Sequence, residues 1–142
     1  MSGCPYRKNT KSDCDHAAIK LPKIYIEKSL IEKSVALTED EFEIIRLHPL
    51  YGANILNTYS MFSINVKSGV LMHHENYDGT GYLTKTYGAA IPLFARILRI
   101  TDSYAAMKSG RPYQKAMTEE AIRKELQRES GKSYDPKILK LF

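Results

Sequence analysis

The chain has 142 residues, 43% of them hydrophobic and 26% charged, which is typical of one globular domain with a single core. No apolar stretch is long enough to span a bilayer, and none follows the basic residues near the N-terminus. We therefore expect a cytoplasmic protein with neither a membrane partner nor a secretory signal. The net charge of +5 suits a polyanionic partner, but the basic residues form no arginine-rich tract, which argues against nucleic acid.

Residues 1–16 are polar and lack periodicity, so we expect a poorly ordered leader followed by one helical domain over residues 17–142. Cys4 and Cys14 both fall in the leader, where we expect free thiols rather than a disulfide. Beyond the leader the apolar spacing is helical, and only residues 23–26 alternate as a strand would. The sequence therefore predicts an all-α fold.

The first predicted helix begins at a capping box, formed by Thr38 and, three residues later, Glu41. This helix ends before Pro49, because a proline ring is incompatible with a helix interior. Pro49 can instead occupy the first turn of a second helix, which is predicted to run through Leu56.

A third helix is predicted over residues 64–75, and the turn-forming residues 76–81 predict a loop after it. Pro92 begins the most regular apolar pattern of the chain, which predicts a fourth helix. Thr118 and Asp135 are typical N-cap residues, and they predict two further helices near the C-terminus.

Two adjacent histidines, His73 and His74, end the third predicted helix. Neighbouring side chains on a helix point about 100° apart, so the pair can reach two adjacent points, which suits a site with two metal ions. Imidazole nitrogen is a good ligand for iron, manganese or zinc. A pair of this kind is more often a solvated surface feature, so the spacing alone does not establish a metal site.

Asp102 lies in the apolar fourth helix, where burial of an unpaired carboxylate would be costly. It is therefore exposed, paired, or a metal ligand. His48 precedes a proline at a junction between helices, and alone it would be structural. Taken with His73 and His74, these residues make four candidate metal ligands on consecutive helices of one bundle.

The order of these motifs resembles the HD-GYP domain family. The similarity covers residues 37–113 and extends to residues 134–136. One position departs from the family's signature, because Leu83 stands where that signature has proline. The matching segments are the helix that ends in His48-Pro49, the run His73-His74-Glu75 with its loop to Tyr82, the helix that carries Asp102, and Arg111-Pro112-Tyr113.

The resemblance implies a helical bundle of the HD superfamily. It also implies a metal-dependent hydrolase of bacterial signalling that opens the phosphodiester of cyclic di-GMP with a metal-activated water. The cofactor would be a divalent metal such as iron or manganese, and the partner cyclic di-GMP or a related nucleotide. The implied residues are the metal ligands His48, His73, His74 and Asp102, the catalytic residues Lys23 and Asp102, and the substrate contacts Tyr82, Arg111, Gly79 and Gly81.

The similarity fails at the His-Asp pair that names the family. In the ungapped register that matches Lys23 with the family's lysine, Ile19-Lys20 replaces this pair. Isoleucine has no donor atom, and a lysine ammonium repels a cation. A shifted register brings Cys14-Asp15 or Asp15-His16 near this place, but it requires inserted residues and loses the match of Lys23.

The family's aspartate is implied to bridge two ions, so we expect one ion rather than two, or none, and impaired catalysis. The alternative is a catalytically inactive nucleotide-binding or protein-interaction module derived from that family. A third hypothesis is an incomplete copy, because the N-terminal helices that the family places upstream are missing here. Apolar side chains near Ile24, Ile26 and Ile44 would then lack cover, which predicts self-association or a protein partner.

Overall fold

The computed structural model describes residues 38–109 and 115–142, and these two parts are helical, without a strand. The predicted all-α fold is confirmed. The predictions made for residues 1–37 and for Arg111 lie outside the described residues. None of the helices in the described ranges is long and apolar enough to cross a membrane. In chain order the elements are α3 (Glu39–Arg46), α4 (His48–Asn57), α5 (Ile64–Met72), the short 3₁₀ helix η2 (Gly88–Ala90), α6 (Leu93–Ser109), α7 (Glu119–Arg128) and α8 (Pro136–Leu139).

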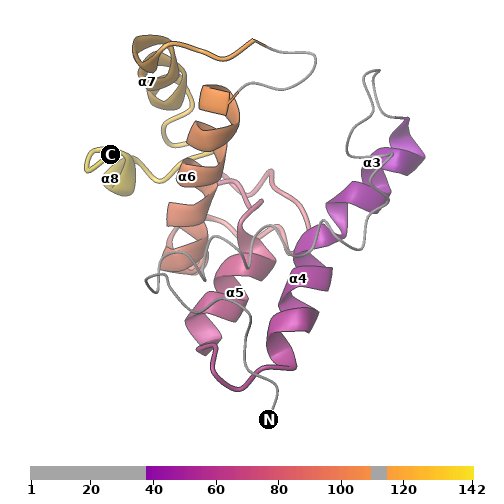
Figure 1. Cartoon of the computed structure of the whole chain (residues 1–142). Coiled ribbons are helices and arrows are strands. Elements are labelled where there is room, and N and C mark those ends of the chain that lie inside the picture. The colour runs from indigo at the N-terminus through magenta and orange to yellow at the C-terminus, as the bar shows by residue number, and fades with distance from the viewer. Residues whose placement is uncertain (1–37, 110–114) are drawn as a thin grey trace, which may run out of the picture.

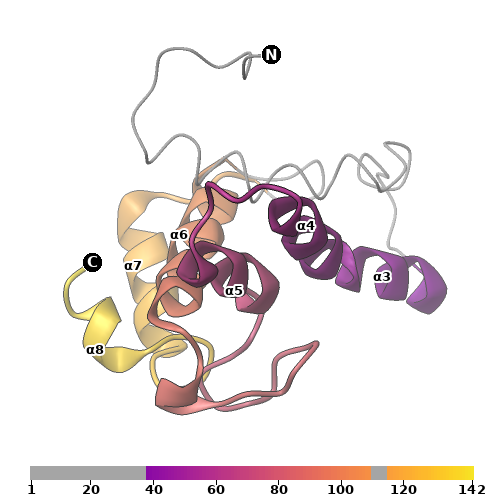
Figure 2. The same ribbon diagram turned by 90° about the horizontal axis from the view of Figure 1, so that it is seen from below.

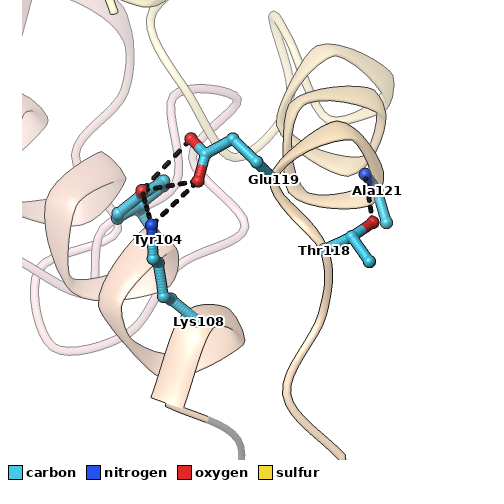
Figure 3. A network of polar contacts seen from close by, with 5 residues as sticks. All are labelled: Tyr104, Lys108, Thr118, Glu119 and Ala121. Carbon is cyan, nitrogen blue, oxygen red and sulfur yellow. Dashed lines mark hydrogen bonds and ion pairs between the residues drawn. The ribbon is translucent and has the colours of Figure 1, made fainter.

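The predicted caps are present at the helix starts. Thr38 Oγ1 accepts the N–H of Glu41 at 3.3 Å, and the Glu41 carboxylate accepts the N–H of Thr38 at 2.8 Å, which completes the capping box of α3. Pro49 lies in the first turn of α4. Thr118 caps α7, as Figure 3 shows, and Asp135 caps α8.

The third helix is shorter than its predicted range of 64–75, because α5 ends at Met72. His73 is its C-cap, and the N–H of Glu75 donates to the carbonyl of Met72 at 3.0 Å in a turn. The His73 imidazole bonds the carbonyl of Val70 at 2.5 Å and so competes for an acceptor that a continuing helix would use. Both histidines therefore lie in a turn just beyond the helix.

Helix α6 is the element around which the others pack. It lies against α5 on one side and against α7 and α8 on the other, while α4 packs on α5 (Figure 1). Helix α3 continues nearly in line with α4 and leads away from the other helices (Figure 2). Most of the buried apolar side chains fall into two clusters, both with a member on α6: Leu56, Val70 and Leu98 in the first, and Ile100, Ile122, Leu126 and Tyr134 in the second.

A buried ion pair ties α6 to the start of α8. The guanidinium of Arg96 pairs with the carboxylate of Asp135, and its Nε–H donates to the carbonyl of Ile91 at 2.9 Å. Burial alone would raise the pKa of Asp135. The hydrogen bonds from Arg96 and from the backbone N–H of Lys137 outweigh burial and hold this pKa below its ordinary value. The positive charge of Arg96 is therefore paired with Asp135, and this pair links α6 to α8.

A second polar network joins α6 to α7 on either side of residues 110–114 (Figure 3). The Tyr104 hydroxyl donates to the Glu119 carboxylate at 2.9 Å, and Lys108 Nζ donates to both groups at 3.0 Å. The hydrogen bonds from Lys108 and Tyr104 lower the pKa of Glu119. Lys108 and Glu119 are exposed to solvent, so this ion pair adds little to stability, while the half-buried ring of Tyr104 packs against the second core cluster.

Replacement of Leu56 by alanine tests the first core cluster. Leu56 is only 1% exposed, so its truncation leaves a cavity between α4, α5 and α6. We expect the free energy of unfolding to fall by about 2–5 kcal/mol. Leu141→Ala is the matched control because Leu141 is 88% exposed. Urea denaturation measures both variants, and equal effects would contradict the position of the core.

Candidate metal centre

Three histidines from two helix ends meet in the structure. His48 begins α4, while His73 and His74 follow α5. The Nε2 atom of His48 lies 3.2 Å from Nε2 of His73 and 3.1 Å from Nε2 of His74. One ring nitrogen of each residue lies within 4.8 Å of the other two. His48 and His73 are 4% and 1% exposed, so this cluster of nitrogens is largely shielded from water.

Backbone carbonyls fix the orientation of two of these rings. Nδ1 of His48 lies 2.7 Å from the carbonyl oxygen of Ile45, and Nδ1 of His73 lies 2.5 Å from that of Val70. A carbonyl oxygen can only accept a hydrogen bond, so each Nδ1 carries the proton. In the neutral rings, Nε2 then presents a lone pair toward the centre of the cluster.

This arrangement fits a metal ion. Two lone pairs that face each other at the 3.2 Å between His48 and His73 repel unless a proton or a cation lies between them. Burial lowers the pKa of His73 to about 4, so this ring is neutral near pH 7. A divalent cation satisfies all three nitrogens at once, and imidazole suits zinc, iron, copper or nickel. The other ring nitrogen, Nδ1, of His48 and of His73 is hydrogen-bonded to a backbone carbonyl, as is typical of metal-binding histidines.

Asp102 lies beside this cluster rather than within it. Only the three histidines belong to the group of mutually close ligand atoms among the described residues. Asp102 is half-buried on α6 and lines a cavity of about 290 Å³ that His74 also lines. The carboxylate is therefore a neighbour of the histidines, and its role as a metal ligand stays a prediction.

The ring of Tyr82 stacks on the ring of His74. Their centroids are 4.9 Å apart and their planes differ by 19°. Burial raises the pKa of the Tyr82 hydroxyl above its ordinary value, so the hydroxyl remains protonated at neutral pH. Tyr82 thus stabilises the position of one of the three candidate ligands, and its contact with substrate stays a prediction.

Gly79 and Gly81 are required by the loop itself. Gly79 has a φ of +85°, in the region that favours glycine. A Cβ atom at Gly81 would lie 2.4 Å from the backbone nitrogen of Asn76, because the loop folds back on residues 74–76. The close approach that Gly81 permits is therefore to the chain's own backbone, and substrate contact by either glycine stays a prediction.

Glu75 is a structural residue of the site that sequence reasoning missed. It is 2% exposed, and its Oε1 accepts the N–H of Thr84 at 2.7 Å, the hydroxyl of Thr84 at 3.0 Å and the N–H of Lys85 at 3.2 Å. Its place directly after the two histidines was the available signal. The buried carboxylate holds the end of the loop that carries Tyr82.

The backbone of this loop is strained on both sides of Thr84. Leu83 has a φ of +88° and Lys85 a φ of +53°, which are unusual values for residues with a side chain. The N–H groups of Thr84 and Lys85 both donate to the Glu75 carboxylate, and these bonds hold the segment in place. Proline, which the family has at position 83, is restricted to a φ near about −65° and cannot adopt this backbone.

Restoring the family's residue by Leu83→Pro is therefore expected to destabilise the protein. The ring would force the loop out of its observed conformation, at a cost of about 1–3 kcal/mol in the free energy of unfolding. The control is Leu83→Gly, which tolerates the positive φ and should leave the fold intact. Chemical denaturation compares the three proteins, and a proline variant as stable as wild type would contradict the positive φ of Leu83.

The pKa of His73 also predicts how the metal-free protein responds to acid. Burial lowers this pKa from 6.5 to about 4, so protonation favours the unfolded state. The contribution of the neutral His73 to the free energy of unfolding is then fully present above about pH 6.5 and is lost as the pH falls toward 4. Melting temperatures recorded with a chelator should follow this course in wild type and vary less in His73→Gln. A flat profile for wild type between these pH values would contradict the burial of a neutral imidazole.

The chain belongs to the HD domain family, which its sequence matches over residues 14–138. Its relatives within this family include cyclic dinucleotide phosphodiesterases, which confirms the resemblance to HD-GYP domains. It is 40% identical over 118 residues to the cyclic di-GMP phosphodiesterase response regulator RpfG of Xanthomonas campestris pv. campestris, covering 82% of this chain and 31% of that protein. It is 35% identical over 121 residues to the 3'3'-cGAMP-specific phosphodiesterase 2 of Vibrio cholerae, covering 84% of this chain and 23% of that protein.

A solved structure confirms the fold. The crystal structure of a cyclic GMP-AMP-specific phosphodiesterase of V. cholerae, V-cGAP3, matches with a TM-score of 0.59 at 23% sequence identity. The match covers 94% of this chain and 32% of that chain. The chain thus spans about a third or less of the length of these relatives.

Proposed function

We propose that this chain is a metal-dependent phosphodiesterase domain for cyclic di-GMP, with catalysis weakened by the loss of the His-Asp pair. The observation that carries the proposal is the cluster of three Nε2 atoms from His48, His73 and His74. Two of these rings are fixed by backbone carbonyls in the tautomer that binds a cation. Relatives named as cyclic di-GMP phosphodiesterases support the substrate class.

The three histidines, with Asp102 beside them, are the residues that would hold the metal. A bound divalent ion would lower the pKa of a water molecule and polarise a phosphoryl oxygen. The chain's own contribution is to hold the ligands in place. The carbonyls of Ile45 and Val70 orient two rings, and Tyr82 packs against the third. The predicted phosphate contacts of Lys23 and Arg111 belong to the same proposal.

Ile19-Lys20 is the reason to expect weak turnover. In the register that matches Lys23, the bridging aspartate is replaced by a cation, so a second ion lacks its ligand. The family match begins at residue 14, and it therefore includes Asp15 and His16, which belong to the shifted register. Under the shifted register the chain would be expected to bind two ions and to be active.

The replaced pair also favours a second candidate function. A domain that keeps the three histidines and its cyclic dinucleotide contacts, but lacks an effective nucleophile, would bind the nucleotide without opening it. Since relatives carry names that specify either cyclic di-GMP or 3'3'-cGAMP, both nucleotides are candidates for such binding. Self-association belongs with this proposal, because Ile44 on α3 is 50% exposed.

Metal content and hydrolysis test the proposal together. We expect purified wild type to hold at most one tightly bound ion and to hydrolyse cyclic di-GMP and 3'3'-cGAMP slowly. His73→Ala should weaken metal affinity by roughly tenfold to a hundredfold or more, because even a supporting partner of a ligand is worth that much. The double variant Ile19→His, Lys20→Asp should gain metal and turnover.

Elemental analysis and product chromatography provide the two readouts. Two tightly held ions in wild type would contradict the single-ion expectation and favour the shifted register. Metal-loaded wild type that binds either nucleotide without hydrolysis would favour the non-catalytic function. Wild type that binds neither metal nor nucleotide would contradict both functions.

A further inference from the structure

Arg99 on α6 lies one helical turn before Asp102, and both side chains line the cavity beside the histidines. This cavity measures about 290 Å³, close to the lower end of ligand pockets. Arg99 is half-buried, so its charge is partly removed from water. Neither the sequence motifs nor the proposed function accounts for a cation at this position.

The contacts of Arg99 fix its guanidinium without neutralising it. Nε and Nη2 both donate to the side-chain oxygen of Asn76, at 3.2 and 2.9 Å, and Nη1 donates to the hydroxyl of Ser103 at 3.4 Å. The guanidinium also lies 5.8 Å from the ring centroid of Tyr134. A guanidinium has five N–H groups, so these bonds leave one N–H on each terminal nitrogen. Two parallel donors of this kind match the oxygens of a phosphate.

The other half-buried arginines make the contrast clear. Arg96, one turn earlier on α6, is paired with the buried Asp135, and Arg46 is paired with Glu43. Within residues 38–109 and 115–142, Arg99 is the half-buried arginine without a carboxylate within 4.0 Å. Burying an unpaired charge is unfavourable, so a site with this geometry gains stability when an anion enters.

Two carboxylates also line the cavity, and both must be considered. Glu125 is engaged with Arg128, whose Nη2 and Nε donate to it at 2.6 and 2.9 Å. Asp102 lines the cavity together with His74, and a cation bound at the histidines would offset its charge. An anion in this cavity would therefore contact the guanidinium of Arg99 on one side and lie near His74, one of the candidate metal ligands, on the other.

We propose that Arg99 binds a phosphate oxygen of the substrate in this cavity, with Asn76 and Ser103 holding the guanidinium in position. The inference rests on the proposed function, because it places a phosphodiester beside the three histidines. It adds a phosphate-binding residue to that function. The ligand class is a phosphate monoester or diester, and the substrate would present one of its two phosphodiesters to Arg99.

Binding of two probes to metal-loaded protein tests Arg99. The probes are cyclic di-GMP, measured by calorimetry, and inorganic phosphate, measured by NMR titration. We expect Arg99→Gln to weaken both by roughly tenfold to a hundredfold, the value of hydrogen bonds to a charged group. Arg99→Lys should lie between wild type and Arg99→Gln, because lysine keeps the charge but lacks the fork. Arg123→Gln removes an exposed arginine from α7 and should change neither affinity.

Metal content and melting temperature, measured on the same samples, separate a binding role from a structural one. The proposal requires that Arg99→Gln keep both at the wild-type level while its affinity falls. Unchanged affinity in Arg99→Gln, or a loss of metal that accounts for the weaker binding, would overturn it. If phosphate binding depends on Arg99 but cyclic di-GMP does not bind at all, the anion site stands and the proposed substrate is wrong. Wild type that binds neither probe would overturn the site and the substrate together.

Discussion

Two hydrogen bonds from imidazole rings to backbone carbonyls underlie the candidate metal centre. The Nδ1 protons of His48 and His73 are committed to the carbonyls of Ile45 and Val70, so in the neutral rings the two Nε2 atoms face each other as lone pairs. The carbonyls belong to the turns that precede each histidine, which links the state of the rings to the local path of the chain. The chemistry of the site is therefore decided by main-chain geometry as much as by the identity of the ligands.

The helix starts and the fold class could be predicted because their signals are local. Thr38 with Glu41, and Pro49 in a first turn, satisfy nearby backbone groups wherever the helix packs. The end of α5 at Met72 was predicted three residues too late. The apolar pattern gives no warning of the bond between the His73 ring and Val70 that accompanies this end.

The site was predicted in part, for a similar reason. His48, His73 and His74 could be named as candidate ligands because they lie in motifs whose order resembles the HD-GYP family, although neither His48 alone nor the His73-His74 pair alone indicates a metal site. The partners of Glu75 and Arg99 gave no such signal. Glu75 contacts residues 84–85 across a loop, and Arg99 on α6 contacts Asn76 in the loop that follows α5. Contacts of this kind arise only when the chain is folded.

The place of α6 in both core clusters bears on how an ion would bind at the candidate metal centre. Leu98 and Ile100 are two residues apart, about 200° around the helix, so α6 is packed against a core cluster on each of two nearly opposite sides. It can neither rotate nor slide without disturbing one cluster or the other. Asp102 is thereby held beside the histidines before any ion arrives. An ion that bound at the three histidines would find this neighbouring carboxylate already in place, and little of its binding free energy would go into ordering α6.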